Sequence, residues 1–124
     1  MFPALKITFC GLIFGSSVAW ANCAPPEAPT IPDGSEASMQ EMLDGKSAVS
    51  EFQKANEVYR NCLSEKIEAV SARPADSANK GEAASIQAEH GKMVEAYNDA
   101  VGAEETLADQ FNQAIRAYKK ANPG

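Results

Sequence analysis

The sequence predicts an all-α protein, an antiparallel two-helix hairpin of coiled-coil type with an extended Pro-rich N-terminal arm held by a disulfide bond. Apolar residues recur with the period of a helix along two long stretches, whereas no stretch shows the strict alternation of a half-buried strand. A short polar segment separates these stretches, and a Pro-rich segment with one cysteine precedes them. The expected order is a signal peptide (1–21), the arm (22–34), a first helix (35–73), a loop (74–77) and a second helix (78–121), with 22–124 forming one mature domain.

The first 21 residues have the organisation of a cleavable secretory signal peptide. Lys6 precedes a mostly apolar run, and small residues then lead to Ala21, which is the order of a charged start, an apolar core and a cleavage site. An apolar run of about nine residues is shorter than the roughly 20 that a helix needs to cross a bilayer. We therefore expect cleavage between Ala21 and Asn22, export of the mature chain and no membrane insertion afterwards. Asn22 also disfavours lipid attachment at Cys23, because a lipoprotein signal has a small residue in that place.

The charge of the mature chain excludes two classes of partner. Cleavage leaves 103 residues with a formal charge of −7, because the leader carries Lys6 and no acidic side chain. An acidic surface repels nucleic acid and anionic lipid headgroups, since both are bound through Lys and Arg side chains. A chain of this length buries only a modest core, so a cross-link or a partner chain is expected to add stability.

Two cysteines remain after cleavage, in a compartment where disulfides persist. Cys23 and Cys62 lack the C-x-x-C spacing of a redox-active pair, so we expect a structural disulfide between them. As a polyproline helix the arm spans about 37 Å at ~3.1 Å per residue, and a helix from Ser35 to Cys62 spans about 40 Å at ~1.5 Å per residue. The arm is therefore expected to turn at Asp33-Gly34 and to run back along the first helix. Such a cross-link stabilises a fold by roughly 3 to 4 kcal/mol in the chain-entropy treatment.

The first helix has two candidate starts. Asp33 with Glu36, and Ser38 with Glu41, both have the capping-box spacing, in which two side chains satisfy free amides at a helix start. Gly45 lies within the helical pattern and costs about 1 kcal/mol relative to Ala. The apolar or small residues of this pattern are Met42, Val49, Phe52, Ala55, Tyr59, Cys62, Leu63, Ile67 and Val70.

A polar segment that contains Pro74 is expected to form the hairpin loop, and Asp76 or Ser77 can cap the helix that follows. Basic residues near the end of this second helix complement the negative pole of its dipole. Its pattern contains two heptad sets. They are Val94, Val101, Ala108 and Ile115, and the companion set His90, Tyr97, Glu104, Phe111 and Tyr118.

Three glycines interrupt the second helix, at Gly81, Gly91 and Gly102. One interpretation is that they face solvent. The other is that the arm or a second subunit approaches the helix backbone closely at these places, where a side chain would be in the way.

A loop this short makes the two helices antiparallel neighbours. With the loop centred near residue 75, Phe52 lies roughly opposite Tyr97, and Glu104 lies near Lys46. An ion pair between Glu104 and Lys46 is a hypothesis, since Glu104 falls on a mostly apolar stripe. Each helix of a hairpin buries one stripe, so the remaining apolar surface is expected to be covered by the arm, by a second copy or by a client protein.

No pattern of residues indicates an enzyme, a cofactor or a metal site. His90 is the only histidine, and a zinc site needs three or four ligands. Glu104, Glu105 and Asp109 form an acidic cluster but lack the oxygen-rich loop of a calcium site. Nucleophilic and acid-base catalysis both need a concave site with oriented partners, which a two-helix hairpin does not provide. We expect no enzyme activity, a structural histidine and a solvated acidic face.

The residues Cys23-x-x-Pro26-x-x-Pro29-x-Ile31-Pro32-Asp33-Gly34, followed by a helix with Met42, Phe52, Tyr59 and Cys62-Leu63, form a recognisable arrangement. Over residues 22–67 the chain resembles small uncharacterised exported helical proteins of Gram-negative bacteria. The resemblance implies a periplasmic location and supplies no activity or catalytic residue.

Interaction rather than catalysis is the function that these features favour. We expect an exported helical hairpin that binds a protein partner through exposed helix faces, and a second copy of the chain is one candidate for that partner. The alternative is a holdase-like periplasmic chaperone, since some such chaperones are dimers of long antiparallel hairpins. The chain lacks the L-T-x-x-Q repeat of one such group and the basic character of another. A small-ligand or metal-binding module is the third class, and it predicts a thermal shift when the ligand is added.

Overall fold

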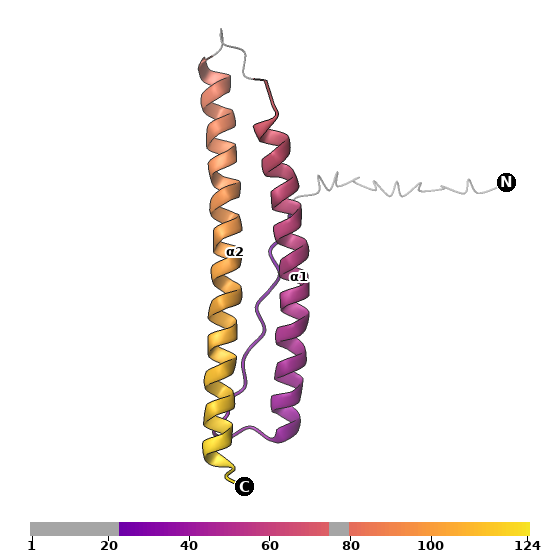
Figure 1. Ribbon diagram of the computed structural model, residues 1–124, viewed down its shortest axis with the longest axis vertical. Coiled ribbons are helices and arrows are strands. Elements are labelled where there is room, and N and C mark those ends of the chain that lie inside the picture. The colour runs from indigo at the N-terminus through magenta and orange to yellow at the C-terminus, as the bar shows by residue number, and fades with distance from the viewer. Residues whose placement is uncertain (1–22, 75–79) are drawn as a thin grey trace, which may run out of the picture.

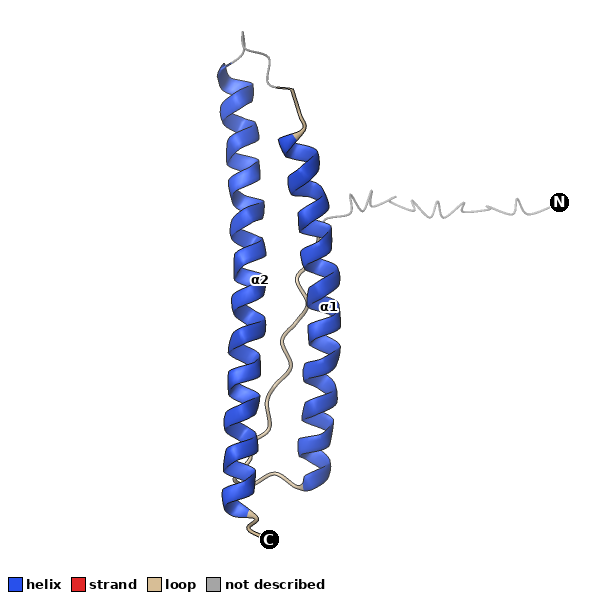
Figure 2. Cartoon of the chain, in the orientation of Figure 1, coloured by secondary structure: helices blue, strands red, loops and turns tan. Residues whose placement is uncertain are grey.

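The computed structural model describes residues 23–74 and 80–124 of the chain. Two long helices, α1 (Met39–Ser71) and α2 (Lys80–Ala121), lie side by side in antiparallel orientation (Figure 1). The arm runs along one groove of this pair, and the described residues contain no strand (Figure 2). The predicted fold class, an all-α antiparallel hairpin with an arm held by a disulfide, is confirmed. The signal segment, the cleavage site at Ala21 and Asn22, and most of the expected 74–77 loop lie outside the described residues.

Helix α1 begins four residues later than the expected Ser35. Ser38 is its N-cap, with the Ser38 side chain accepting from the backbone N–H of Glu41 and the Glu41 side chain accepting from the backbone N–H of Ser38. The Asp33 pair with the same spacing forms a separate turn, in which the N–H groups of Glu36 and Ala37 donate to the Asp33 carbonyl at 3.1 and 2.8 Å. Of two possible capping boxes, the second starts the helix and the first reverses the chain. Helix α1 ends at Ser71, because a residue that precedes a proline such as Pro74 is disfavoured in helical conformation.

Buried positions recur every seven residues on both helices, as in a coiled coil. On α1 the positions that share this spacing are Met42, Val49, Asn56, Leu63 and Val70. On α2 they are Ala100, Leu107 and Ala114. The members of both heptad sets expected for α2 are half-buried and flank this line, whose own residues belong to neither set. The central cluster is Val49, Phe52 and Leu107, with Ile31 of the arm and Phe111 packed against it.

The register between the helices differs from the expected one by about ten residues. The cross-helix pairs Asn56–Glu104 and Arg73–Glu89 have their midpoints at residues 80 and 81, whereas a centre near residue 75 was expected. A shift of the centre by about five residues moves the partner of every residue by about ten. The reason is that α2 starts at Lys80, so the connection is longer and lies further along the chain. As a result Phe52 packs against Leu107, and the expectation that it faces Tyr97 is wrong.

Candidate functional site

The arm is attached at its far end by the predicted disulfide. Cys23 and Cys62 are bonded, with a Cα–Cα distance of 5.6 Å and a sequence separation of 39, which is normal disulfide geometry. Within the arm, Cys23, Pro26, Pro29 and Pro32 are half-buried, and most residues between them are exposed. A spacing of three is the period of a polyproline helix, so one edge of the arm faces the hairpin along its whole length.

At the turn the arm touches α2 through Gly34. A Cβ atom at Gly34 would overlap the carbonyl oxygen of Ala114 and would lie 2.9 Å from the backbone N of Tyr118. These neighbours are helix backbone, which cannot move aside as a side chain can. Only glycine lets the arm reach α2 this closely, and this contact fixes where the arm begins its return along the hairpin.

A second close approach lies between the arm and α1. Gly45 is buried, and a Cβ atom there would lie 3.0 Å from Pro32 Cδ and 3.3 Å from Phe111 Cε2. Gly45, which weakens the helix, thus leaves room for Pro32 of the arm to pack against α1. By contrast, a Cβ atom at Gly91 or Gly102 would meet nothing within 4 Å, which agrees with the solvent-facing interpretation of these two glycines.

Two carboxylates at the start of the hairpin are held ionised by local hydrogen bonds. The hydroxyl of Ser35, at 2.6 Å, and then its backbone N–H lower the pKa of Asp33. The backbone N–H of Ser38, also at 2.6 Å, and then the Ser38 side chain lower the pKa of Glu41. Both carboxylates are exposed, so these shifts arise from turn and helix-cap geometry and not from a desolvated site.

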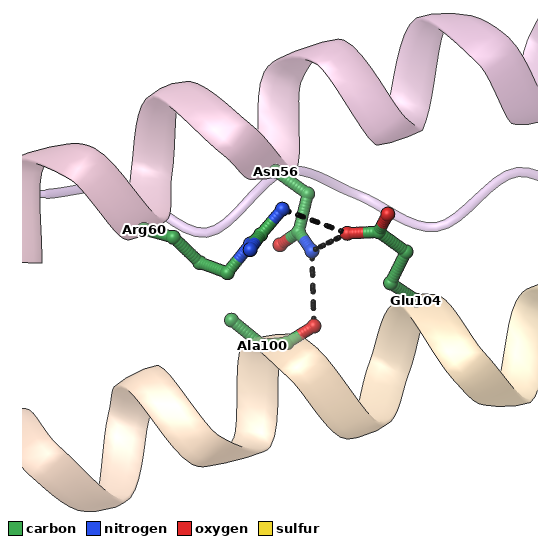
Figure 3. A network of polar contacts seen from close by, with 4 residues as sticks. All are labelled: Asn56, Arg60, Ala100 and Glu104. Carbon is green, nitrogen blue, oxygen red and sulfur yellow. Dashed lines mark hydrogen bonds and ion pairs between the residues drawn. The ribbon is translucent and has the colours of Figure 1, made fainter.

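A polar network crosses the middle of the hairpin (Figure 3). Asn56 is 1% exposed, and its Nδ2 donates to the carbonyl of Ala100 and to Glu104 Oε2, both at 2.9 Å. Arg60 Nη2 lies 3.3 Å from the same Glu104 oxygen. The expected partner of Glu104 was Lys46, and that expectation is wrong because of the changed register. Because a buried amide without partners is costly, the network favours the observed register over neighbouring ones.

The arm covers one of the two grooves between the helices. Near the turn it forms a hollow with Gln110, Gln113, Ala114 and Ala117 of α2. Val101, Ala108 and Ile115 lie on the opposite side of α2. Ile115, for example, follows Gln113 of this hollow by two residues, which is a rotation of about 200° around the helix axis. We call the surface around the second groove the open face. Its residues are Met39, Leu43, Lys46, Gln53, Arg60, Val101, Glu104, Glu105, Ala108, Phe111, Ile115, Tyr118, Lys119 and Asn122.

The open face is apolar at the end of the hairpin where α1 starts. Met39 is 58% exposed and Leu43 49% exposed, beside half-buried Ile115 of α2. Lys46 and Lys119 line the same groove, which has a volume of about 470 Å³. This part of an acidic chain therefore combines exposed apolar side chains with two positive charges. Further along, the groove is lined by Arg60, Glu104 and Glu105 and becomes polar.

The remaining candidates form no chemical site within the described residues. His90 is half-buried in a shallow hollow beside Val70 and Arg73, near the end of α1. Glu104 belongs to the polar network, whereas Glu105 and Asp109 are exposed. In residues 23–74 and 80–124, no three His, Cys, Asp or Glu side chains lie close enough together to hold a metal ion. Neither helix is both long and apolar enough to cross a membrane.

Comparison with known proteins gives no match to a family model, to a curated protein or to a solved structure. The geometry of the chain itself is therefore the basis for a functional proposal.

Sequence reasoning missed Asn56, although its place seven residues from Val49 and from Leu63 on a heptad line was a usable signal.

Proposed function

We propose that this chain is an exported, non-catalytic protein of the bacterial periplasm that acts through protein–protein contact on its open face. The observation that carries the proposal is the asymmetry of the hairpin: the arm fills one groove, while the opposite groove keeps Met39 and Leu43 exposed. Exposed apolar side chains gathered in one place are typical of an interaction surface.

The proposed location rests on the sequence and agrees with the cross-link. The first 21 residues have the pattern of a cleavable signal, and a disulfide such as Cys23–Cys62 persists in oxidising compartments.

The two carboxylates with shifted pKa values belong to a turn and a helix cap and do not indicate a catalytic site. Catalytic acids and bases have pKa values tuned by burial and by partners within a cleft. The pKa values of Asp33 and Glu41 are instead lowered by hydrogen bonds within one turn of the backbone, at exposed positions. Their role is to fix the turn and the start of α1.

Capture of partners from living cells tests the proposal. A tagged chain is cross-linked before lysis, and its partners, including untagged copies of the chain, are identified for the unmodified protein and for a Met39→Glu, Leu43→Glu variant. The control is Val58→Glu, because Val58 is 69% exposed on α1 and does not line the open face.

A defined partner that is retained by the control and lost by the double variant supports the proposal. A broad set of unfolded proteins, lost in the same way, would replace it with the holdase-like chaperone. Equal capture by all three proteins would overturn the role of the open face.

A further inference from the structure

One stripe of α2 on and beside the open face has a self-complementary order of residues. Its members are spaced alternately by four and three residues, so they lie along one side of the helix. All of them are half-buried or exposed, and so available for contact. They are Val101, Glu105, Ala108, Asn112, Ile115, Lys119 and Asn122.

Antiparallel pairing of the five central residues of this stripe, Glu105 to Lys119, matches charge with charge and apolar with apolar residues, whereas at its ends Val101 lies opposite Asn122. When Asn112 meets Asn112 of a second copy, Glu105 lies opposite Lys119 and Ala108 lies opposite Ile115, each pair being formed twice. In a parallel arrangement Glu105 would face Glu105 and Lys119 would face Lys119, which is repulsive. An Asn pair at a contact position also favours one register, since slipped registers leave its amides without partners.

The size of the surface is sufficient for a specific, weak dimer. Residues 101–122 span about 30 Å, and two helices of roughly 10 Å each give a width of about 20 Å. Two copies would then bury on the order of 1,200 Å², the lower bound for specific interfaces. Met39 and Leu43 of α1 lie on the same open face and would be covered together with the stripe.

We propose that the partner of the open face is a second copy of this chain, bound antiparallel about a two-fold axis at Asn112 to form a four-helix assembly. The inference rests on the proposed function, because it names the occupant of that interaction surface. It gives a partner to Lys119, one of the two lysines on the open face of an acidic chain, since Lys119 faces Glu105 of the second copy. Exposed ion pairs contribute little individually, so the dimer is weak and dissociates on dilution. Salt weakens it further, because ions screen the charges of these pairs.

The register is tested with single cysteines in the chain from Asn22 onward. Asn112→Cys places the new thiol on the two-fold axis, so mild oxidation converts the protein to a covalent dimer. Asn98→Cys is the matched control, because Asn98 is exposed on the same side of α2 but lies about 40 Å from its copy in this arrangement, at 1.5 Å per residue. Equal rates of cross-linking for the two variants would overturn the register.

The association itself is tested by sedimentation equilibrium over a range of concentrations. Lys119→Glu and Glu105→Lys are each expected to raise the dissociation constant about tenfold, and the double variant is expected to return it to near the original value. A chain that stays monomeric at millimolar concentration, or a double variant weaker than both single variants, would overturn the inference. The proposed function would still stand in that case if the capture experiment found another protein that depends on Met39 and Leu43.

Discussion

The side-chain amide of Asn56 on α1 donates a hydrogen bond of 2.9 Å to the backbone carbonyl of Ala100 on α2, from a position that is 1% exposed. Asn56 occupies a heptad position whose other members are apolar, and Ala100 has a small side chain that leaves its carbonyl accessible. This contact helps to set the register of the hairpin. The register in turn decides which residues form the open face.

Truncation of Asn56 is expected to destabilise the fold. Asn56→Ala removes both hydrogen bonds and leaves a small cavity, so the free energy of unfolding should fall by about 1 to 3 kcal/mol. Asn61→Ala is the control, because Asn61 is exposed on the same helix and surface substitutions change stability by about 0.5 kcal/mol or less. Urea denaturation measures both, and equal effects would show that the buried amide makes no special contribution.

Substitution of glycines by alanine distinguishes positions where another segment approaches closely from positions where only helix propensity matters. Gly34→Ala is expected to displace the arm, because the new Cβ would overlap the Ala114 carbonyl. Gly91→Ala and Gly102→Ala meet no neighbour within 4 Å and should raise stability by up to about 1 kcal/mol each through helix propensity. Thermal unfolding distinguishes the two classes. Stabilisation by Gly34→Ala would contradict the close contact between the arm and the backbone of α2 at Gly34.

Gly45→Ala is a finer test of the same contact. The gain of about 1 kcal/mol in helix propensity opposes a tight contact of 3.0 Å between the new Cβ and Pro32. We expect no net gain in stability in the intact protein and a gain once Pro32→Ala removes the opposing ring. The two substitutions should therefore be non-additive in a double-mutant cycle. Additive effects would show that the arm does not press on α1 at Gly45.

Removal of the cross-link is expected to weaken the arm more than the helices. The Cys23→Ser, Cys62→Ser variant should lose up to about 4 kcal/mol by the loop-entropy treatment. Circular dichroism should still show a helical protein, because α1 and α2 pack directly on each other through Phe52 and Leu107. Limited proteolysis in the arm should become faster. Unchanged stability in denaturant would mean that the packing of the arm suffices without the bond.

The two carboxylates at the hairpin start predict the direction of the pH dependence. Hydrogen bonds in the folded state lower the pKa values of Asp33 and Glu41, so their contribution to stability is present at neutral pH and is lost as pH falls through the lowered values. Stability should therefore decrease below about pH 4. Asp33→Asn with Glu41→Gln should reduce stability at neutral pH and make the loss of stability in acid less steep. Glu57→Gln is the control, because Glu57 is an exposed carboxylate in the middle of α1. A loss of stability in acid that is unchanged in the double variant would contradict the account.

Local features of the fold were predictable from the sequence, and pairing in space was only partly so. The two helices and the Cys23–Cys62 bond follow from periodicity, spacing and chain length, whereas the spacing alone did not decide between Asp33 and Ser38 as the cap of α1. The register did not follow, because a shift of a few residues in the loop moves every cross-helix pair by twice that number. For the same reason Glu104 was given the partner Lys46 in place of Arg60.

The glycines show a second limit of sequence reasoning. Gly34 is required by the approach of another segment and Gly45 lies in tight contact with one, whereas Gly91 meets no neighbour, and the sequence pattern does not distinguish these cases. The open face was anticipated only in general terms, as apolar surface left over by a hairpin. Its position became definite once the arm was seen to cover the other groove.

Site-specific photo-cross-linking in cells shows whether a partner binds on the open face. A photoreactive amino acid is placed at Leu43 on the open face, or at Val58 elsewhere on α1; both are exposed apolar positions. We expect a discrete cross-linked product from position 43 and none from position 58. Products of equal yield from both positions, or from position 58 alone, would contradict the claim that the face left open by the arm is the binding surface.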